Sequence, residues 1–256
     1  MNLAQHRAAS VLAASGAPLN RVAELVLAGR YPDFRPSPPY LPYVSSLPPG
    51  DVTRAVRLPA AQDLSARDRS LASVIAARRS GRLVTKPLDP STLATLLAAA
   101  SGIPPMIPDA TFAAVIYPIV FAIEGIPGGA YRYAHHEHAL VPICDVDRQT
   151  VAETAILQHE HSTGVALLFL VVPLSHWLMT FGDRGYRGAA FAAGWLTDRL
   201  YLVAETLGLT YTATGAFAPA IIDELLTIDG CERTAFFAFA VGGERRAAFP
   251  DARSGI

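Results

Sequence analysis

The sequence predicts an α+β layered domain in which helices flank a mixed, mainly antiparallel sheet. Hydrophobic residues make up 51% of the 256-residue chain, so a sizeable core of buried helices and strands is expected. Apolar runs of strand length alternate with helix-like segments, and the continuous apolar run over residues 164–172 indicates a strand buried on both faces. No internal repeat is visible. These features together indicate a layered domain.

The first 62 residues are expected to form an arm ahead of the main domain. Residues 3–29 predict two short helices separated by a Gly-Ala-Pro break. Residues 31–62 carry too many prolines for a helix and too many aromatic residues for a mere linker. We therefore expect an N-terminal helical and proline-rich arm over residues 1–62, lying on the body or on a partner subunit, and a main domain over residues 63–256.

The elements of the main domain follow from apolar periodicity and from turn and cap residues. The helix at 89–101 is the clearest case, because Asp89 can cap it, Pro90 suits its first turn and Gly102 ends it. The expected order is a helix at 65–79, the helix at 89–101, a strand at 113–123, a hairpin of 130–133 and 139–143, a helix at 148–159, a strand at 164–172, a helix at 185–207, a strand at 210–214, a helix at 219–226 and a strand at 234–241.

Composition excludes several classes of partner. A net charge of -1 does not suit a nucleic-acid binder. The longest apolar runs, 112–123 and 164–174, are too short to cross a membrane, and the N-terminus lacks the leucine-rich centre of a secretory signal. Cys144 and Cys231 have no metal or redox spacing, which fits a reducing compartment. We therefore expect a cytoplasmic protein.

The segment Arg78–Arg82, with the sequence RRSGR, is the most informative stretch of the chain. It places three guanidinium groups and the Ser80 hydroxyl within five residues at the end of a predicted helix. Arginine forks match phosphate oxygens in pairs, and the hydroxyl adds a donor, so the segment could hold a phosphorylated ligand. The alternative is a solvated basic helix end, where cations suit the helix dipole.

Two further clusters combine glycine with polar or small residues. Residues 181–187, FGDRGYR, place an aspartate, two arginines and a tyrosine on a loop before the long helix, where polar substrates are favoured. The alternative there is an Asp183–Arg187 pair that orders the loop. Residues 214–217, TGAF, would let a flat ligand approach the backbone, or they could form an ordinary strand-to-helix turn.

No metal site is expected from the histidines. His135, His136 and His138 lie at a predicted hairpin tip, and His159 and His161 lack the spacing of two ligands on one helix face. The motifs of nucleophilic hydrolases, P-loop enzymes and Rossmann dinucleotide-binding proteins are also absent from the sequence.

The order of short motifs over residues 55–243 resembles the FMN-dependent nitroreductase superfamily. Within it the chain is similar to the SagB-type branch, which contains the azoline dehydrogenases of thiazole/oxazole peptide biosynthesis and the oxidase domains of peptide synthetases. The matching motifs are RRSGR at 78–82, KPLD at 86–89, IYP at 116–118, GAYRY at 129–133, GDRGYR at 182–187, LYL at 200–202, LGL at 207–209 and GAF at 215–217.

The resemblance implies a homodimer of nitroreductase-like α+β subunits with FMN bound between them. By that analogy the flavin phosphate and ribityl chain would be held by Arg78, Arg79, Ser80 and Arg82. Thr214, Gly215 and Ala216 would lie against the isoalloxazine ring. A C-terminal arginine, Arg245 or Arg253, would complete the phosphate site.

The chain departs from its relatives at the residues expected to line the reacting face. The azoline dehydrogenases carry a Lys-Tyr pair where this chain has Thr180 and Phe181, and neither can act as a base. A proline-serine-glycine-glycine stretch near the flavin is replaced by residues 111–114, TFAA. A general base could instead come from Tyr186, Tyr117 or the substrate.

The resulting hypothesis is an FMN-dependent dehydrogenase or oxidase in peptide natural-product biosynthesis. It would carry out azoline-to-azole type oxidation of a heterocyclic or amino-acid-derived intermediate, linked to a peptide or carrier, with biosynthetic complex partners. One alternative keeps FMN but acts as a nitro- or quinone-reductase that uses NAD(P)H. Another is a catalytically retired family member that serves as a scaffold.

Overall fold

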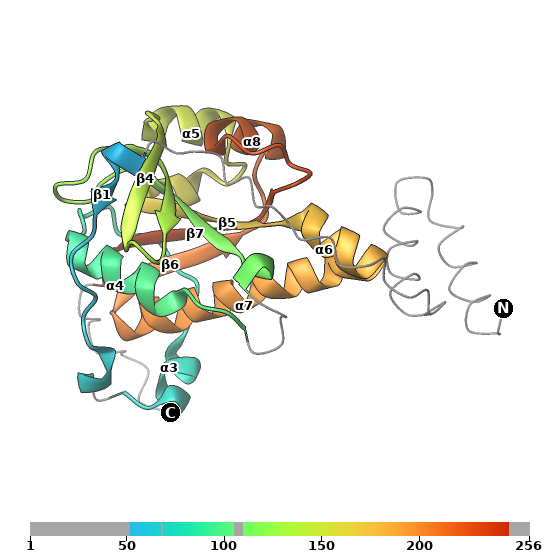
Figure 1. Ribbon diagram of the computed structural model, residues 1–256. Coiled ribbons are helices and arrows are strands. Elements are labelled where there is room, and N and C mark those ends of the chain that lie inside the picture. Colours follow the sequence, from blue (N-terminus) through green and yellow to red (C-terminus); the bar gives the residue numbers. More distant parts are fainter. Residues whose placement is uncertain (1–51, 68, 105–109, 246–256) are drawn as a thin grey trace, which may run out of the picture.

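The computed structural model describes residues 52–67, 69–104 and 110–245, which form a seven-stranded sheet with helices on both faces (Figure 1). Every pair of neighbouring strands is antiparallel, and among the described residues the isolated bridge between Leu88 and Ile123 is parallel. The predicted α+β class and mainly antiparallel sheet are confirmed. In sheet order the strands are β1 (Val56–Arg57), β4 (Ala139–Cys144), β3 (Gly129–Ala134), β2 (Val115–Val120), β5 (Ala166–Val172), β7 (Thr234–Glu244) and β6 (Leu209–Thr214).

Helices cover the two faces of the sheet unequally. In Figure 1 α4 and α7 lie along one face, and α5 and α8 lie together on the other. The helices are α3 (Leu71–Ala77), α4 (Pro90–Ala100), α5 (Arg148–Thr154), α6 (Leu174–Phe181), α7 (Gly185–Thr206) and α8 (Pro219–Leu226). Short 3-10 turns are η1 (Val52–Arg54), η2 (Leu64–Ala66), η3 (Ala110–Phe112), η4 (His159–Thr163) and η5 (Gly182–Arg184). None of the helices in the described ranges has the length and apolar character needed to cross a membrane.

Three apolar clusters form the core. The largest joins the sheet to α4 and α7 through residues such as Leu93, Leu196 and Phe239. A second fills the opposite face between the sheet and α5 and α8. A third, around Phe112 and Trp177, fixes α6 and η3 against the first half of α7. Because the β5 run is completely buried, the prediction of a strand covered on both faces is confirmed.

Side chains hold both ends of α4. The Asp89 carboxylate accepts hydrogen bonds from the backbone N–H groups of Ser91 and Thr92, as the sequence predicts for an N-cap. At the other end the Arg199 guanidinium, which comes from α7, donates to the carbonyls of Ala99 and Ala100. Arg199 therefore ties α7 to α4 by satisfying helix-end carbonyls.

Two predicted helices are interrupted. The predicted helix at 65–79 is wrong over its first half, because a new helix start at Ser70 separates η2 from α3. The Ser70 hydroxyl accepts from the N–H of Ser73 and so acts as an N-cap. The predicted helix at 148–159 ends at Thr154, because the next residues pair with residues 216–218, including an Ile156–Phe217 bridge.

Two elements were not expected from the sequence. Helix α6 fills residues that carried no assignment, and the predicted FGDRGYR loop is divided between the end of α6, η5 and the first turn of α7. Strand β1 joins the sheet edge next to β4 within the stretch assigned to the arm. Residues 1–51 of the arm expected over residues 1–62 lie outside the described residues.

Candidate functional site

The RRSGR segment leaves α3 and runs along β6. The backbone N–H of Arg79 donates to the Tyr211 hydroxyl at 3.3 Å, and the N–H of Gly81 donates to the Tyr211 carbonyl at 3.1 Å. A third bond joins Val84 N–H to the Thr210 hydroxyl at 2.9 Å. The backbone is thus fixed against a strand, while all five side-chain positions from 78 to 82 remain exposed to solvent.

Tyr201 of α7 links this segment to the end of β6. Its hydroxyl lies 3.2 Å from the Ser80 hydroxyl and accepts the N–H of Ala213 at 3.0 Å, and the Arg78 guanidinium lies 4.9 Å above its ring. Because Tyr201 accepts from Ala213, its own proton can go to Ser80, which leaves the Ser80 proton available to a ligand. Sequence reasoning matched the LYL motif but assigned Tyr201 no role.

The predicted ring-binding residues 214–216 follow directly from Ala213. The Thr214 hydroxyl donates to the Gln158 side chain at 2.8 Å and accepts the N–H of Ala216 at 2.9 Å, so this turn is held in place. Gly215 is exposed, and a Cβ built on it would meet no atom within 4 Å. The structure therefore brings the predicted phosphate and ring residues together, with open space above the backbone of Gly215.

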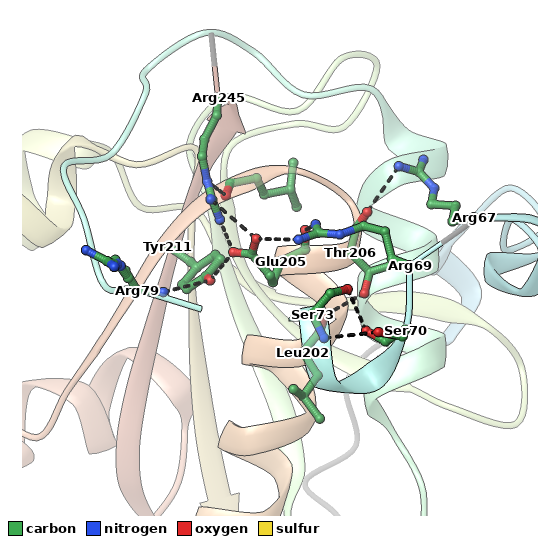
Figure 2. Close-up of polar contacts among 11 residues, drawn as sticks. Arg67, Arg69, Ser70, Ser73, Arg79, Leu202, Glu205, Thr206, Tyr211 and Arg245 are labelled. Atoms are coloured by element: carbon green, nitrogen blue, oxygen red, sulfur yellow. Dashed lines mark hydrogen bonds and ion pairs between the residues drawn. The ribbon is translucent and has the colours of Figure 1, made fainter. Parts of the chain in front are cut away.

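Arg245, which is expected at the phosphate site, forms an ion pair within the chain. Figure 2 shows its guanidinium directed at the carboxylate of Glu205, with which it forms an ion pair. Arg69 reaches the same carboxylate at 3.1 Å, and the Tyr211 hydroxyl donates to it at 2.5 Å. The Glu205 side chain is 2% exposed, so Arg245 forms its ion pair with a buried carboxylate that lies beneath the RRSGR segment. The other predicted arginine, Arg253, lies outside the described residues.

This network shifts the pKa values of its members in opposite directions. Burial alone would raise the pKa of Glu205, but hydrogen bonds from Arg245, Tyr211 and Arg69 outweigh it and lower the pKa below its usual range. For Tyr211, burial and then the bond to Glu205 raise the pKa to about 12. Glu205 is therefore a permanent anion at neutral pH, and Tyr211 is a permanent hydrogen-bond donor to it.

The charges around the segment are consequently unequal. Glu205 forms ion pairs with both Arg69 and Arg245, whereas no carboxylate within the described residues forms an ion pair with Arg78, Arg79 or Arg82. Clustered guanidinium groups without a protein counter-ion attract anions, and phosphate oxygens match their geometry. The chemistry of this donor set fits a phosphorylated ligand.

Tyr117 and Tyr186, the two tyrosines predicted as general bases, do not lie at the RRSGR segment. Tyr117 of β2 is fully buried in the second core cluster and forms part of a cavity wall. Tyr186, on the first turn of α7, is 42% exposed, and its ring centre is 5.5 Å from that of Phe236. Fifteen residues, or about 22 Å of helix, separate Tyr186 from Tyr201. Within one chain, Tyr186 is therefore distant from the RRSGR segment.

An aromatic cluster fills the place where the sequence departs from its relatives. Phe181 packs on Phe112 and Trp177, with ring centres 5.6 and 5.5 Å apart. His176 is 1% exposed, stacks on Phe112 at 4.1 Å and lies with its Nε2 3.0 Å from the Thr111 hydroxyl. Sequence reasoning missed His176, because an isolated histidine in an unassigned segment gave no signal.

A cavity of about 1120 Å³ opens beside this cluster, at the end of the sheet where β2 begins and β3 ends. Thr111, Tyr117, His135 and His136 are among the residues of its wall. His138, in contrast, has a structural contact, since its Nδ1 is 2.8 Å from the Tyr133 hydroxyl. Within the described ranges, no group of three or more histidine, cysteine or acidic side chains is arranged to hold a metal ion.

Comparison with known proteins agrees with this architecture. The model of the nitroreductase family matches residues 75–243. A nitroreductase candidate from Methanocaldococcus jannaschii is 29% identical over 185 residues, which are 69% of this chain and 91% of that protein.

Solved structures show the same fold. A nitroreductase candidate from Anabaena variabilis superposes with a TM-score of 0.61 at 24% identity over 67% of this chain, and this chain spans 37% of that protein. One from Ralstonia eutropha gives 0.60 at 19% identity, covering 76% of this chain and 91% of the other. A chain of the Escherichia coli microcin synthetase McbBCD, in a complex with truncated pro-MccB17 bound, gives 0.57 at 17% identity, covering 91% and 84%.

Proposed function

Since the chain belongs to the nitroreductase family and is thereby an oxidoreductase of that family, we propose that it is an FMN-dependent dehydrogenase or oxidase of peptide natural-product biosynthesis. Its substrate would be a heterocyclic or amino-acid-derived intermediate carried on a peptide or carrier, from which two hydrogens are removed. The observation that carries the flavin part is the RRSGR segment, with cations that no carboxylate of the described residues neutralises.

The residues present fit a flavin mononucleotide. Arg78, Arg79 and Arg82 would bind the phosphate, and the Ser80 hydroxyl would donate to the phosphate or the ribityl chain. The open backbone at Gly215 leaves room for a flat ring next to Thr214 and Ala216. Arg245 contributes indirectly, by binding the carboxylate that supports Tyr211. Bound FMN would supply the two-electron chemistry that no protein side chain provides.

The protein's own residues would orient the substrate and handle its proton. Tyr117, in the cavity wall, and Tyr186, outside it, remain the candidates from the sequence. A third candidate is His176, a buried side chain whose Nε2 lies 3.0 Å from the hydroxyl of the wall residue Thr111. Thr180 and Phe181 carry no basic group, and Phe181 packs among aromatic rings, so we expect a proton route different from that of the azoline dehydrogenases.

A homodimer would complete this site. The RRSGR segment packs near the C-terminal half of α7, whereas Tyr186 lies at the other end of that helix. Large apolar side chains are exposed on α3 and α7, including Leu71 and Ile75 on α3 and Phe191 on α7. A second copy that covers these side chains could bring Tyr186 of one subunit to the flavin held by the other.

The biosynthetic part of the proposal draws support from the microcin synthetase likeness. That chain matches 91% of this protein, whereas the Anabaena and Ralstonia structures match 67% and 76%. A likeness at 17% identity concerns the fold, so the substrate class has to be tested directly.

The first test is flavin binding by the purified full-length protein. We expect a visible absorption spectrum of bound flavin, identified as FMN after release, in near-stoichiometric amount. The double substitution Arg78→Ala with Arg82→Ala should abolish flavin retention. Arg67→Ala is the matched control, because Arg67 is exposed nearby but donates to the Thr206 carbonyl. A double variant that stays yellow would refute the phosphate assignment.

A nitro- or quinone-reductase that uses NAD(P)H is the second candidate, and the large cavity favours it because such a pocket admits varied substrates. Anaerobic mixing decides between the two. Rapid bleaching of the flavin by NAD(P)H would support the reductase, and bleaching by azoline-containing peptides would support the dehydrogenase. A colourless protein that refuses added FMN would leave the scaffold hypothesis.

A further inference from the structure

The cavity at the end of the sheet is large and asymmetric in its chemistry. Its volume of about 1120 Å³ slightly exceeds the usual range of about 300–1,000 Å³ for small-molecule sites. One part of the wall is apolar, with small residues that include Ala113, Ala114, Val115 and Val171. Such a wall suits the flat or apolar body of a ligand, but it gives that ligand no orientation.

Three arginines lie in the rest of the wall. Arg57 of β1, Arg132 of β3 and Arg233, which precedes β7, come from three separate elements and line the same space. Glu137, at the exposed tip of the β3–β4 hairpin, is the one carboxylate among the wall residues described. Among the described wall residues, Arg57 and Arg132 alone outnumber Glu137, and Arg233 has a contact of its own, although the whole chain has a net charge of -1.

Arg132 is the arginine of this wall that has a buried, unused hydrogen-bond donor. It lies opposite Val141 in the register of β3 with β4, and both residues line the cavity. Its Nε is buried and has no hydrogen-bond partner among the described residues. A buried guanidinium N–H without a partner is costly, and a carboxylate in the cavity could accept from Nε and a neighbouring Nη together.

We propose that this cavity binds a ligand with a carboxylate group on an aromatic or heterocyclic body, and that Arg132 recognises the carboxylate. The inference rests on the proposed function in one respect, since it makes this ligand the substrate of the flavin site. The proposal narrows the substrate class to carboxylic acids. The charge and shape of the cavity support it, and it uses no residue of the RRSGR segment.

The test compares two probes that differ in charge alone. Binding of 4-nitrobenzoate and of its neutral isostere 4-nitrobenzamide is measured calorimetrically, at neutral pH and without reductant, on the purified full-length protein with whatever cofactor it retains. We expect the acid to bind at least tenfold more tightly than the amide. Equal binding of the two probes, or binding of neither, would overturn the proposal.

Substitutions then assign the preference to Arg132. Arg132→Gln should remove the preference for the acid and leave binding of the amide unchanged, and Arg132→Lys should keep only part of it, since the fork is lost. Arg54→Gln is the matched control, because Arg54 is exposed on η1 and outside the cavity wall. A preference that survives in Arg132→Gln contradicts the proposal. If that variant does not fold, the two probes on the unchanged protein still decide.

The two proposals fail in different ways. A yellow protein without preference for the acid would refute the carboxylate site and leave the flavin assignment standing. A colourless protein that prefers the acid would refute the flavin assignment and leave the carboxylate site standing.

Discussion

Glu205 is a buried carboxylate that organises the groups beneath the RRSGR segment (Figure 2). Its oxygens bind Arg69, Arg245 and the Tyr211 hydroxyl. Tyr211 in turn accepts the backbone N–H of Arg79 and, through its carbonyl, that of Gly81. We therefore expect Glu205 to position the segment without touching the ligand, and its loss to affect both stability and flavin affinity.

Replacement of Glu205 by glutamine tests this role. Breaking a buried ion pair on one side typically costs about 3–5 kcal/mol, and the partly exposed arginines should keep the loss near the lower end, at roughly 3 kcal/mol. We expect Glu205→Gln to weaken FMN binding about tenfold, measured by flavin fluorescence quenching, alongside a loss of unfolding free energy in urea. Glu153→Gln on α5 is the exposed control.

The same variant gives a prediction for pH. The folded-state pKa of Glu205 lies below its unfolded value of about 4.3, so its stabilisation is complete above that pH and is lost as the pH falls through the folded pKa. The stability of Glu205→Gln should thus depend less on pH in this acidic range. A variant with unchanged flavin affinity and an unchanged pH profile would contradict the positioning role.

Sequence reasoning found the residues with local signals at this scale and missed those defined by long-range contacts. Arg78, Ser80 and Arg82 share one short motif, so their likeness to phosphate donors was visible. Glu205 and Tyr201 are ordinary residues of an amphipathic helix, and only the packing of β6 against α7 gives them partners. Arg245 was assigned by analogy, and its contact with Glu205 depends on that same packing.

At the scale of elements, the contact between α6 and α7 depends on glycine. A Cβ built on Gly188 would lie 2.1 Å from the Trp177 ring, and one on Gly185 would lie 2.1 Å from the Trp177 carbonyl oxygen. Trp177 cannot move away easily, since it is 5% exposed and its indole donates to the Phe112 carbonyl at 3.0 Å. Gly185 of the GDRGYR motif and Gly188, which follows it, thus allow two helices to approach closely.

Two alanine substitutions in α7 separate this packing from helix propensity. Gly188→Ala should lower the free energy of unfolding by roughly 1–3 kcal/mol through overpacking against Trp177. Gly194→Ala should raise it by up to about 1 kcal/mol, because alanine favours the helix and a Cβ there meets no atom of the chain within 4 Å. Urea titration followed by circular dichroism measures both. Equal effects of the two substitutions would show that the Trp177 contact is unimportant.

Element prediction succeeded where a cap, a first-turn proline or a long apolar run defines the element. Helix α8 begins with Pro219 and occupies the predicted residues 219–226, and α4 begins after its predicted cap at Asp89. Helix α6 was missed because its eight residues have neither a side-chain cap nor a first-turn proline. The premature end of α5 depends on pairing with residues 216–218, which are distant in sequence. Tertiary contacts therefore decided the elements that local patterns left open.

At the scale of the whole molecule, the exposed apolar side chains require an explanation. Leu71 and Ile75 are 64% and 56% exposed on one face of α3, which packs against α7, and Phe191 on α7 is 42% exposed. Scattered apolar side chains are normal on a surface, but Leu71 and Ile75 lie together on the helix that leads into the RRSGR segment, which fits a contact with a second subunit. The proposed composite site then makes dimerisation a condition for flavin retention.

Ile75→Glu tests this condition, because a charge in a buried subunit contact is costly whereas a charge on a free surface is nearly neutral. We expect the unchanged protein to elute as a dimer by light scattering, and Ile75→Glu to shift it towards monomer with a loss of bound FMN at micromolar concentration. The control is Glu153→Lys, which changes charge on the far face, at α5. A monomeric variant that keeps its flavin would show that one chain suffices for binding, and an unchanged protein that is monomeric and yellow would exclude the composite site altogether.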